Sequence, residues 1–200
     1  MIPISLRFVR LALVATGLAL LAGCDTFGIG FGPASPTVPT GRDIDYASDD
    51  LASLVFAVDV PTSLRPLPNK TVATLDASGP KGSKQIKATL VLTDGEAIGG
   101  LLPPPASGRT YFFLGFAAKD KTALVALQKW LKSLPVGSAP VTALDVSPRL
   151  CETAPLDPAA TTFSVLPALP GTRLTPLVSQ DPIASIAAST GGQLPPCGSV

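Results

Sequence analysis

The chain has 200 residues, of which 15 are lysine or arginine, 14 are aspartate or glutamate and none is histidine. This near balance of charges predicts no field that attracts nucleic acid or an anionic lipid surface, and therefore no nucleic-acid partner. Without histidine, Ser-His-Asp catalysis, Cys-His catalysis and zinc sites with histidine ligands are excluded.

The first 24 residues have the layout of a secretory signal. Arg7 and Arg10 give a basic start, and an apolar run of about a dozen residues follows from Leu11 to Ala22. A membrane-spanning helix needs roughly 20 apolar residues. The run therefore predicts export rather than a permanent span.

The end of this signal, Leu21-Ala22-Gly23-Cys24, resembles the lipobox of bacterial lipoproteins. In that family, small residues before the cysteine fit the signal peptidase, and the cysteine thiol is joined to a diacylglycerol. The resemblance implies removal of residues 1–23 and attachment to the membrane, on the periplasmic side, through lipid on Cys24. Asp25 favours the inner membrane, by analogy with enteric lipoproteins. The alternative is an ordinary signal peptide with an unmodified Cys24.

Residues 24–45 predict a flexible tether. Glycine alternates with apolar residues from Phe27 to Gly32, and the spaced prolines Pro33, Pro36 and Pro39 favour extended chain. The prolines also match the pattern of polyproline ligands, but a spacer is the preferred interpretation. The aspartates between residues 43 and 50 lack the glycine and distal glutamate of a calcium loop, and indicate a solvated end of the tether.

A single β-rich domain is expected over residues 46–200, because the 177 residues that follow the signal suit one domain. Its first strand has apolar residues at every second position before Pro61, namely Leu54, Phe56, Val58 and Val60. Strands over 71–76 and 84–92 are expected to form a hairpin around a turn at 78–83, with Ile86, Ala88, Leu90 and Leu92 inward. Residues 110–116, rich in aromatic side chains, predict a central strand buried on both faces.

Residues 119–134 predict the one long helix, which ends before Pro135. An apolar stripe at helical spacing consists of Leu124, Leu127, Leu131 and Leu134, with Ala123 and Trp130 beside it. We expect this stripe to pack on the sheet, although an amphipathic helix can also lie on a membrane or meet a partner.

The last third of the domain is rich in proline. Its apolar segments, 141–150 and 162–169, are interrupted by Pro148 and Pro167, which predicts edge strands or extended loops. A short helix is expected over 181–189, with Asp181 as its cap and Gly191 after its end.

Cys151 and Cys197 remain as an even pair once Cys24 is assigned to lipid. In an exported protein this pair predicts a disulfide, which contributes about 4 kcal/mol in the chain-entropy model. A redox or metal site is the alternative, and it needs closer spacing or further ligands. We therefore expect no metal and no cofactor.

Two short patterns match catalytic motifs only in part. Ser78-Gly-Pro-Lys81 fits the S-x-x-K letters of penicillin-binding proteins, but it lies in a turn and the companion motifs are missing. Asp94 and Glu96 flank Gly95 in a turn, where solvated charges are expected instead of paired catalytic carboxylates. We assign no catalytic residue.

These features predict an α+β fold: a mainly antiparallel sheet or sandwich-like domain with one amphipathic helix packed on it. The expected function is a non-catalytic interaction or assembly module of the cell envelope, with an envelope protein as partner. One alternative is a ligand-binding lipoprotein with an apolar pocket between helix and sheet, lined by Tyr111 and Trp130. Another is an enzyme that uses only Asp, Glu, Ser or Lys.

Overall fold

The computed structural model describes residues 41–67, 69–188 and 191–198. The predicted signal, Cys24 and the tether up to residue 40 lie outside this part of the chain. Its strands are β1 (Val55–Pro61), β2 (Leu64–Pro66), β3 (Val72–Gly79), β4 (Gly82–Leu92), β5 (Arg109–Phe116), β6 (Val141–Ser147), β7 (Leu150–Glu152), β8 (Thr162–Ala168) and β9 (Val178–Pro182). Its helices are the 3₁₀ turn η1 (Leu51–Ser53), α1 (Glu96–Gly99), α2 (Ala118–Lys132) and α3 (Ile183–Ala187).

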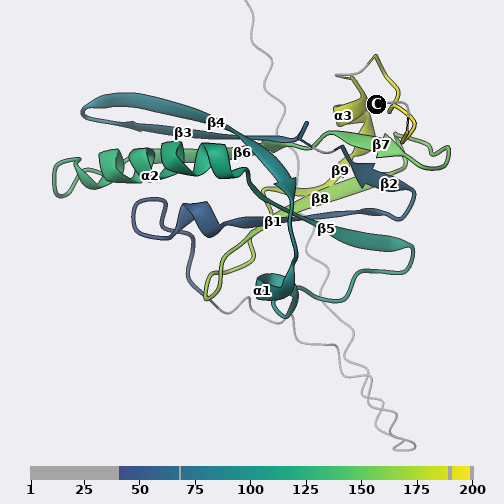
Figure 1. Cartoon of the computed structure of the whole chain (residues 1–200), viewed down its shortest axis with the longest axis horizontal. Helices are drawn as coiled ribbons and strands as arrows, with labels where there is room; N and C mark the ends of the chain where they lie inside the picture. Colours follow the sequence, from purple (N-terminus) through teal and green to yellow (C-terminus); the bar gives the residue numbers. More distant parts are fainter. Residues whose placement is uncertain (1–40, 68, 189–190, 199–200) are drawn as a thin grey trace, which may run out of the picture. The chain divides into compact units, whose positions relative to one another are not determined.

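Seven strands form one curled antiparallel sheet in the order β6-β3-β4-β5-β1-β8-β9, and β2 pairs with β7 separately (Figure 1). β4 joins the two halves of the sheet, because its residues up to Thr89 pair with β3 and its last three pair with β5. The sheet bends there and encloses the main core on its concave side. The predicted α+β fold, a mainly antiparallel sheet with one long helix, is confirmed, and β5 is the central strand.

The two faces of β1 pack in separate clusters. Phe56, Val58 and Val60 are fully buried on the concave face, where the rings of Phe56 and Phe116 meet edge to face with centroids 5.5 Å apart. Ala57 is buried on the convex face, in a cluster with Ile98 of α1. The alternation predicted for this strand is therefore confirmed.

A close contact at Gly95 holds α1 against the convex face. A Cβ atom built on Gly95 would lie 2.3 Å from the ring of Phe113 in β5. Any larger residue would have to displace the ring or the helix. This region was expected to form turns, and neither α1 nor this contact was predicted.

The predicted hairpin is present as β3 and β4, which pair as far as Gly79 and Gly82 around a two-residue turn. Ala88 and Leu90 are buried as expected, and Ile86 is half-buried. Leu92, expected inward, has 50% of its surface exposed. The prediction failed there because Leu92 is the last residue of β4, beyond its pairing with β3.

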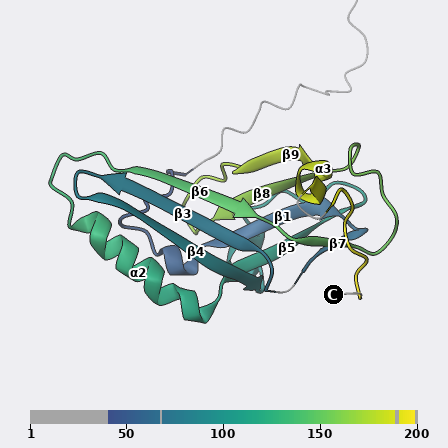
Figure 2. The same cartoon turned by 90° about the horizontal axis from the view of Figure 1, so that it is seen from above.

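The predicted long helix is α2, which lies alongside β4 (Figure 2). Leu124, Leu127 and Leu131 are buried on the side that contacts β4 and η1, and Leu134 is buried just after the helix ends. Asp120 ties the first turn to β4, because its carboxylate accepts a hydrogen bond of 2.8 Å from the Thr89 N–H. Of the two residues predicted beside the stripe, Trp130 is half-buried and Ala123 is exposed.

The two segments that proline predicted to be edge strands or loops, β6 and β8, take different places in the sheet. β6 is an edge strand as predicted, but β8 lies between β1 and β9. The Val165 carbonyl accepts a hydrogen bond from the Leu177 N–H, so it points toward the side of β8 on which β9 lies. Backbone groups two residues apart in a strand point to the same side, so the nitrogen of Pro167 also points there. β9 begins at Val178 and pairs only with the first part of β8. The missing N–H of Pro167 therefore costs no ladder hydrogen bond.

The short C-terminal helix is present as α3, but its start was predicted incorrectly. Pro182 occupies the N-cap position, with no side-chain hydrogen bond to the helix backbone. Asp181 belongs to β9, and its carboxylate instead accepts a weak 3.4 Å hydrogen bond from the Ser185 hydroxyl. Gly191 follows the helix with a positive φ of 86°, a conformation that glycine adopts without strain.

Candidate functional site

The predicted disulfide between Cys151 and Cys197 is present, with Cα atoms 5.0 Å apart. Backbone hydrogen bonds flank it: the Glu152 N–H donates to the Pro195 carbonyl, and the Cys197 N–H donates to the Glu152 carbonyl. Since Cys151 belongs to β7, the bond fastens the C-terminal segment to the small β2–β7 sheet. Its position indicates a structural role.

Tyr111 and Trp130 lie in different clusters. Tyr111 is on the convex face beside Phe113, where burial and the Asp59 carboxylate raise the pKa of the Tyr111 hydroxyl. Trp130 projects from α2 and packs at the margin of the concave core. The structure does not bring the two rings together.

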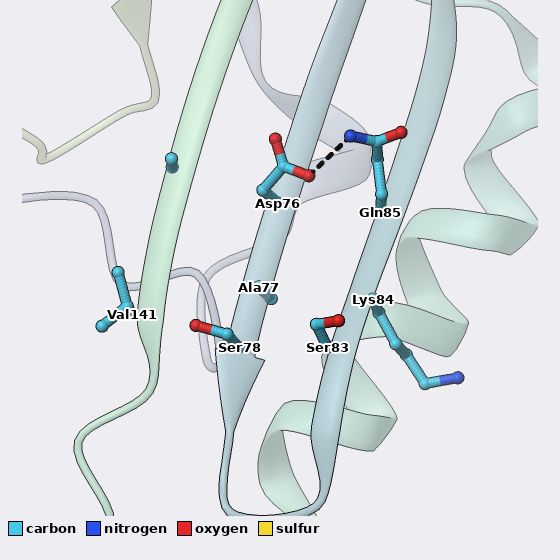
Figure 3. A pocket seen from close by; sticks show the side chains of 8 residues that line it. Asp76, Ala77, Ser78, Ser83, Lys84, Gln85 and Val141 are labelled. Carbon is cyan, nitrogen blue, oxygen red and sulfur yellow. Dashed lines mark hydrogen bonds between the residues drawn. The ribbon is translucent and has the colours of Figure 1, made fainter.

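The hollows on the surface of the described residues include four open ones, with volumes of about 360, 270, 210 and 180 Å³. The largest of these four crosses the outward side of β3, β4 and β6, where Gln85 donates a 2.8 Å hydrogen bond to Asp76 (Figure 3). The second lies between the end of β6 and β9, and the other two border residues 43–47. Neither Tyr111 nor Trp130 lines any of the four.

The motif residues Ser78 and Lys81 are directed to different partners. Ser78 pairs with Ser83 across the hairpin, whereas the Lys81 ammonium donates a 2.6 Å hydrogen bond to the Ser133 carbonyl just after α2. Asp94 and Glu96 are both exposed, as expected. Lys81 therefore contacts the end of α2 and not Ser78.

The aspartates that precede β1 accept hydrogen bonds in local turns. Asp45 accepts from the Ser48 hydroxyl and the Ala47 N–H, and Asp49 accepts from the Arg42 guanidinium and the Asp45 N–H. These hydrogen bonds lower the pKa of Asp45 and of Asp49. Across the described residues, no group of three or more His, Cys, Asp or Glu side chains is arranged to hold a metal ion.

The most pronounced feature of the surface is a concentration of lysine. Seven of the eight lysines in the chain lie on α2 or on β4 and the turn before it, and these segments contain one acidic residue, Asp120. All seven are exposed, and none forms an ion pair within the described part of the chain. The near-zero net charge thus conceals a local excess of positive charge.

We call three of these side chains the lysine face: Lys121, Lys129 and Lys132. They share one side of α2, because the helix repeat brings positions eight and three residues apart to within about 80° of one another. Lys129 lies opposite the buried leucines, and Lys121 and Lys132 lie beside them. Lys121 and Lys129 flank Val125, of which 56% is exposed.

The β3–β4 hairpin contacts the end of α2 at Trp130, which lies about 100° or more around the helix from the lysine face. The Lys84 ammonium lies 5.9 Å from the centroid of the Trp130 ring, close enough for a cation–π attraction. Figure 3 shows Lys84 on the side of α2, away from Asp76. Lys81 is bonded to Ser133, next to Lys132. The concentration of lysine on α2 and β4 was not predicted, because a sum of charges over the chain hides it, although the lysine spacing along the helix is visible in the sequence.

Val136 adds a fully exposed apolar side chain in the loop after α2. The lysine face combines positive charge with the exposed Val125. Every helix in the described ranges is too short or too polar to cross a membrane. The positive charge of this surface suits a negatively charged partner.

No protein-family model matches the chain, and no curated protein or solved structure is significantly similar to it.

Proposed function

We propose that the chain is a bacterial cell-envelope lipoprotein whose β-rich domain acts as a non-catalytic interaction module. Lipid on Cys24 attaches it to the membrane, with the domain on the periplasmic side. Asp25 favours the inner membrane. The observation that carries the proposal is the Leu21-Ala22-Gly23-Cys24 sequence at the end of an export signal.

The Cys151–Cys197 disulfide supports an exported destination, because such bonds persist in oxidising compartments such as the periplasm. The lysine face supports an interaction role, because exposed charges of one sign attract partners of the opposite sign. A second acyl chain is what makes lipid attachment stable, since one chain alone binds only marginally. The diacylated cysteine of the lipobox family meets this requirement.

The test is chemical crosslinking in intact cells that produce either the wild-type chain or the Cys24→Ser variant. The wild-type chain should be in the membrane fraction and should give crosslinked adducts of defined mass. The Cys24→Ser chain should leave that fraction and lose those adducts. A wild-type chain that forms no adduct would contradict the interaction role, and equal membrane attachment of both chains would contradict the anchor.

A further inference from the structure

We propose that the free edge of β6 binds an extended segment of a partner protein, one in which apolar side chains alternate with basic ones. The segment joins the sheet as an added strand. This inference rests on the proposed function, because it names the kind of partner that the interaction module takes. It does not depend on the lysine face of α2.

The hydrogen-bond pattern of the sheet shows which backbone groups of β6 point away from β3. Along a strand, consecutive residues direct their N–H and C=O groups to opposite edges. The Leu90 N–H donates to the Thr71 carbonyl, and this bond fixes the alternation for the β3–β4 pair. Odd-numbered residues of β3 therefore face β4, and even-numbered ones face β6. Since Val72 pairs with Ser147, the odd-numbered residues of β6 bond to β3.

The even-numbered residues of β6, namely Thr142, Leu144 and Val146, consequently direct their N–H and C=O groups to the free edge. β6 is the last strand of the sheet, with β3 as its one neighbour (Figure 2). Within the described residues, these edge groups form no hydrogen bond. A row of unpaired groups on a regular strand is a template for a further strand. Pro140 and Pro148 lie just outside β6 and end this template on both sides, because proline has no N–H.

The opposite edge of the sheet, at β9, is irregular. The pairing of β9 with β8 shifts between Phe163 and Val165, and Gln180 has a positive φ of 51°. The Gln180 N–H donates to the Ser164 hydroxyl and not to a backbone carbonyl. Such irregularities protect an edge from pairing. β6 is therefore the edge at which the sheet accepts a strand.

The space beside β6 suits a single strand. Six successive antiparallel pairs connect β6 to β9, so these two edge strands run in the same direction. A strand that is antiparallel to β6 is therefore antiparallel to β9 as well. The hollow of about 270 Å³ lies between the end of β6 and β9, and the hollow of about 180 Å³ borders the start of β6. A second folded copy would bring its own neighbouring strands against β9, so a single extended segment is the better fit.

Apolar side chains border the inner side of this edge. Leu144 is half-buried, Val146 is buried, and Phe163 and Ile186 line the hollow between β6 and β9. An added strand directs every second side chain to this inner side. Apolar residues at those positions bury surface against these groups, which favours their binding.

Carboxylates predominate around the same edge. The two hollows beside β6 are lined by Asp145, Asp181 and Asp45, against one basic residue, Arg149. The three aspartates are exposed, and none forms an ion pair within the described ranges. Directly opposite side chains on paired strands have Cβ atoms about 5 Å apart. A lysine or arginine opposite Asp145 therefore provides charge complementarity, so the edge selects a segment that alternates apolar and basic residues.

The test uses the acylated mature protein in detergent and synthetic peptides of about seven residues. The first probe alternates valine and lysine. The second has the same sequence with N-methylated valine amides, which cannot donate to β6. Amide hydrogen exchange, followed by NMR, is the readout. In the free protein the amides of Thr142, Leu144 and Val146 should exchange much faster than those of Ala143 and Asp145, which bond to β3.

The first probe should slow exchange at the three edge amides about tenfold when its concentration is ten times its dissociation constant. The N-methylated probe should leave exchange unchanged, and equal protection by both probes would overturn the proposal. Slow exchange at these amides without any probe would also overturn it, because a segment of the same chain or a second copy would then already occupy the edge.

Two variants test the backbone and the charge of the edge separately. Thr142→Pro removes an N–H that faces away from β3, so it should weaken probe binding about fivefold and leave the melting temperature nearly unchanged. Asp145→Asn should weaken binding about two- to fivefold. The control Asp94→Asn removes an exposed carboxylate far from β6 along the chain and should bind the probe like wild type. Wild-type affinity in either edge variant would contradict the proposed contact.

The two proposals fail in different ways. A chain that attaches to the membrane and forms crosslinked adducts, but whose edge amides are not protected by the first probe, refutes only the β6 contact. A chain that binds the probe at these amides, but whose membrane attachment is unaffected by Cys24→Ser, refutes only the anchor.

Discussion

At the scale of single residues, the disulfide has the clearest energetic role. It closes a 46-residue separation and joins β7 to the C-terminal segment. Replacing both Cys151 and Cys197 with serine should lower the free energy of unfolding by about 4 kcal/mol, less any strain that is released. Denaturant unfolding under oxidising conditions measures this. The reduced wild-type protein is the control and should unfold like the variant, whereas an unchanged midpoint in the variant would show that the bond carries no stability.

Single residues also show where prediction from sequence stops. Pairing Cys151 with Cys197 needed only counting, once Cys24 was assigned to lipid. The contact between Gly95 and Phe113 depends on two segments that meet only in the folded chain. No local pattern marks Gly95 as the residue over which an aromatic ring packs.

At the scale of elements, α2 has two sides with different physical roles. Leu124 is fully buried, and its neighbour Val125 is exposed. Leu124→Ala should lower the free energy of unfolding by about 2–5 kcal/mol, because it leaves a cavity against the sheet. Val125→Ala should change it by no more than about 0.5 kcal/mol. Urea denaturation of the two variants checks this, and similar losses in both would mean that α2 is packed differently.

Elements with a strong period were predictable, and elements defined by their neighbours were not. The alternation in β1 and the leucine repeat in α2 identified each buried side, because burial follows the 2.0 and 3.6 repeats. The position of β8 inside the sheet depends on where β9 begins, and Pro167 alone favoured an edge. The lysine repeat on the outer side of α2 was equally regular. These lysines form a surface only because the helix packs its leucines on the sheet and leaves the lysines exposed.

At the scale of the whole molecule, charge is distributed very unevenly. The chain carries 15 basic and 14 acidic residues, so a sum over the sequence predicts a neutral surface. The fold nevertheless places seven lysines on two neighbouring elements, α2 and β4 with its turn. Asp45 and Asp49 lie in the turns before β1, a segment that Gln128 of α2 contacts by hydrogen bonds to its backbone. Composition bounds the total charge, while topology decides where that charge is concentrated.

The central claim concerns one covalent bond, and the mass of the mature protein tests it most directly. Intact-mass and amino-terminal peptide spectrometry on protein purified from its native membrane should find a chain that begins at Cys24 and carries fatty acyl groups. A mature chain that begins at any other residue, or a Cys24 without acyl groups, would contradict the account.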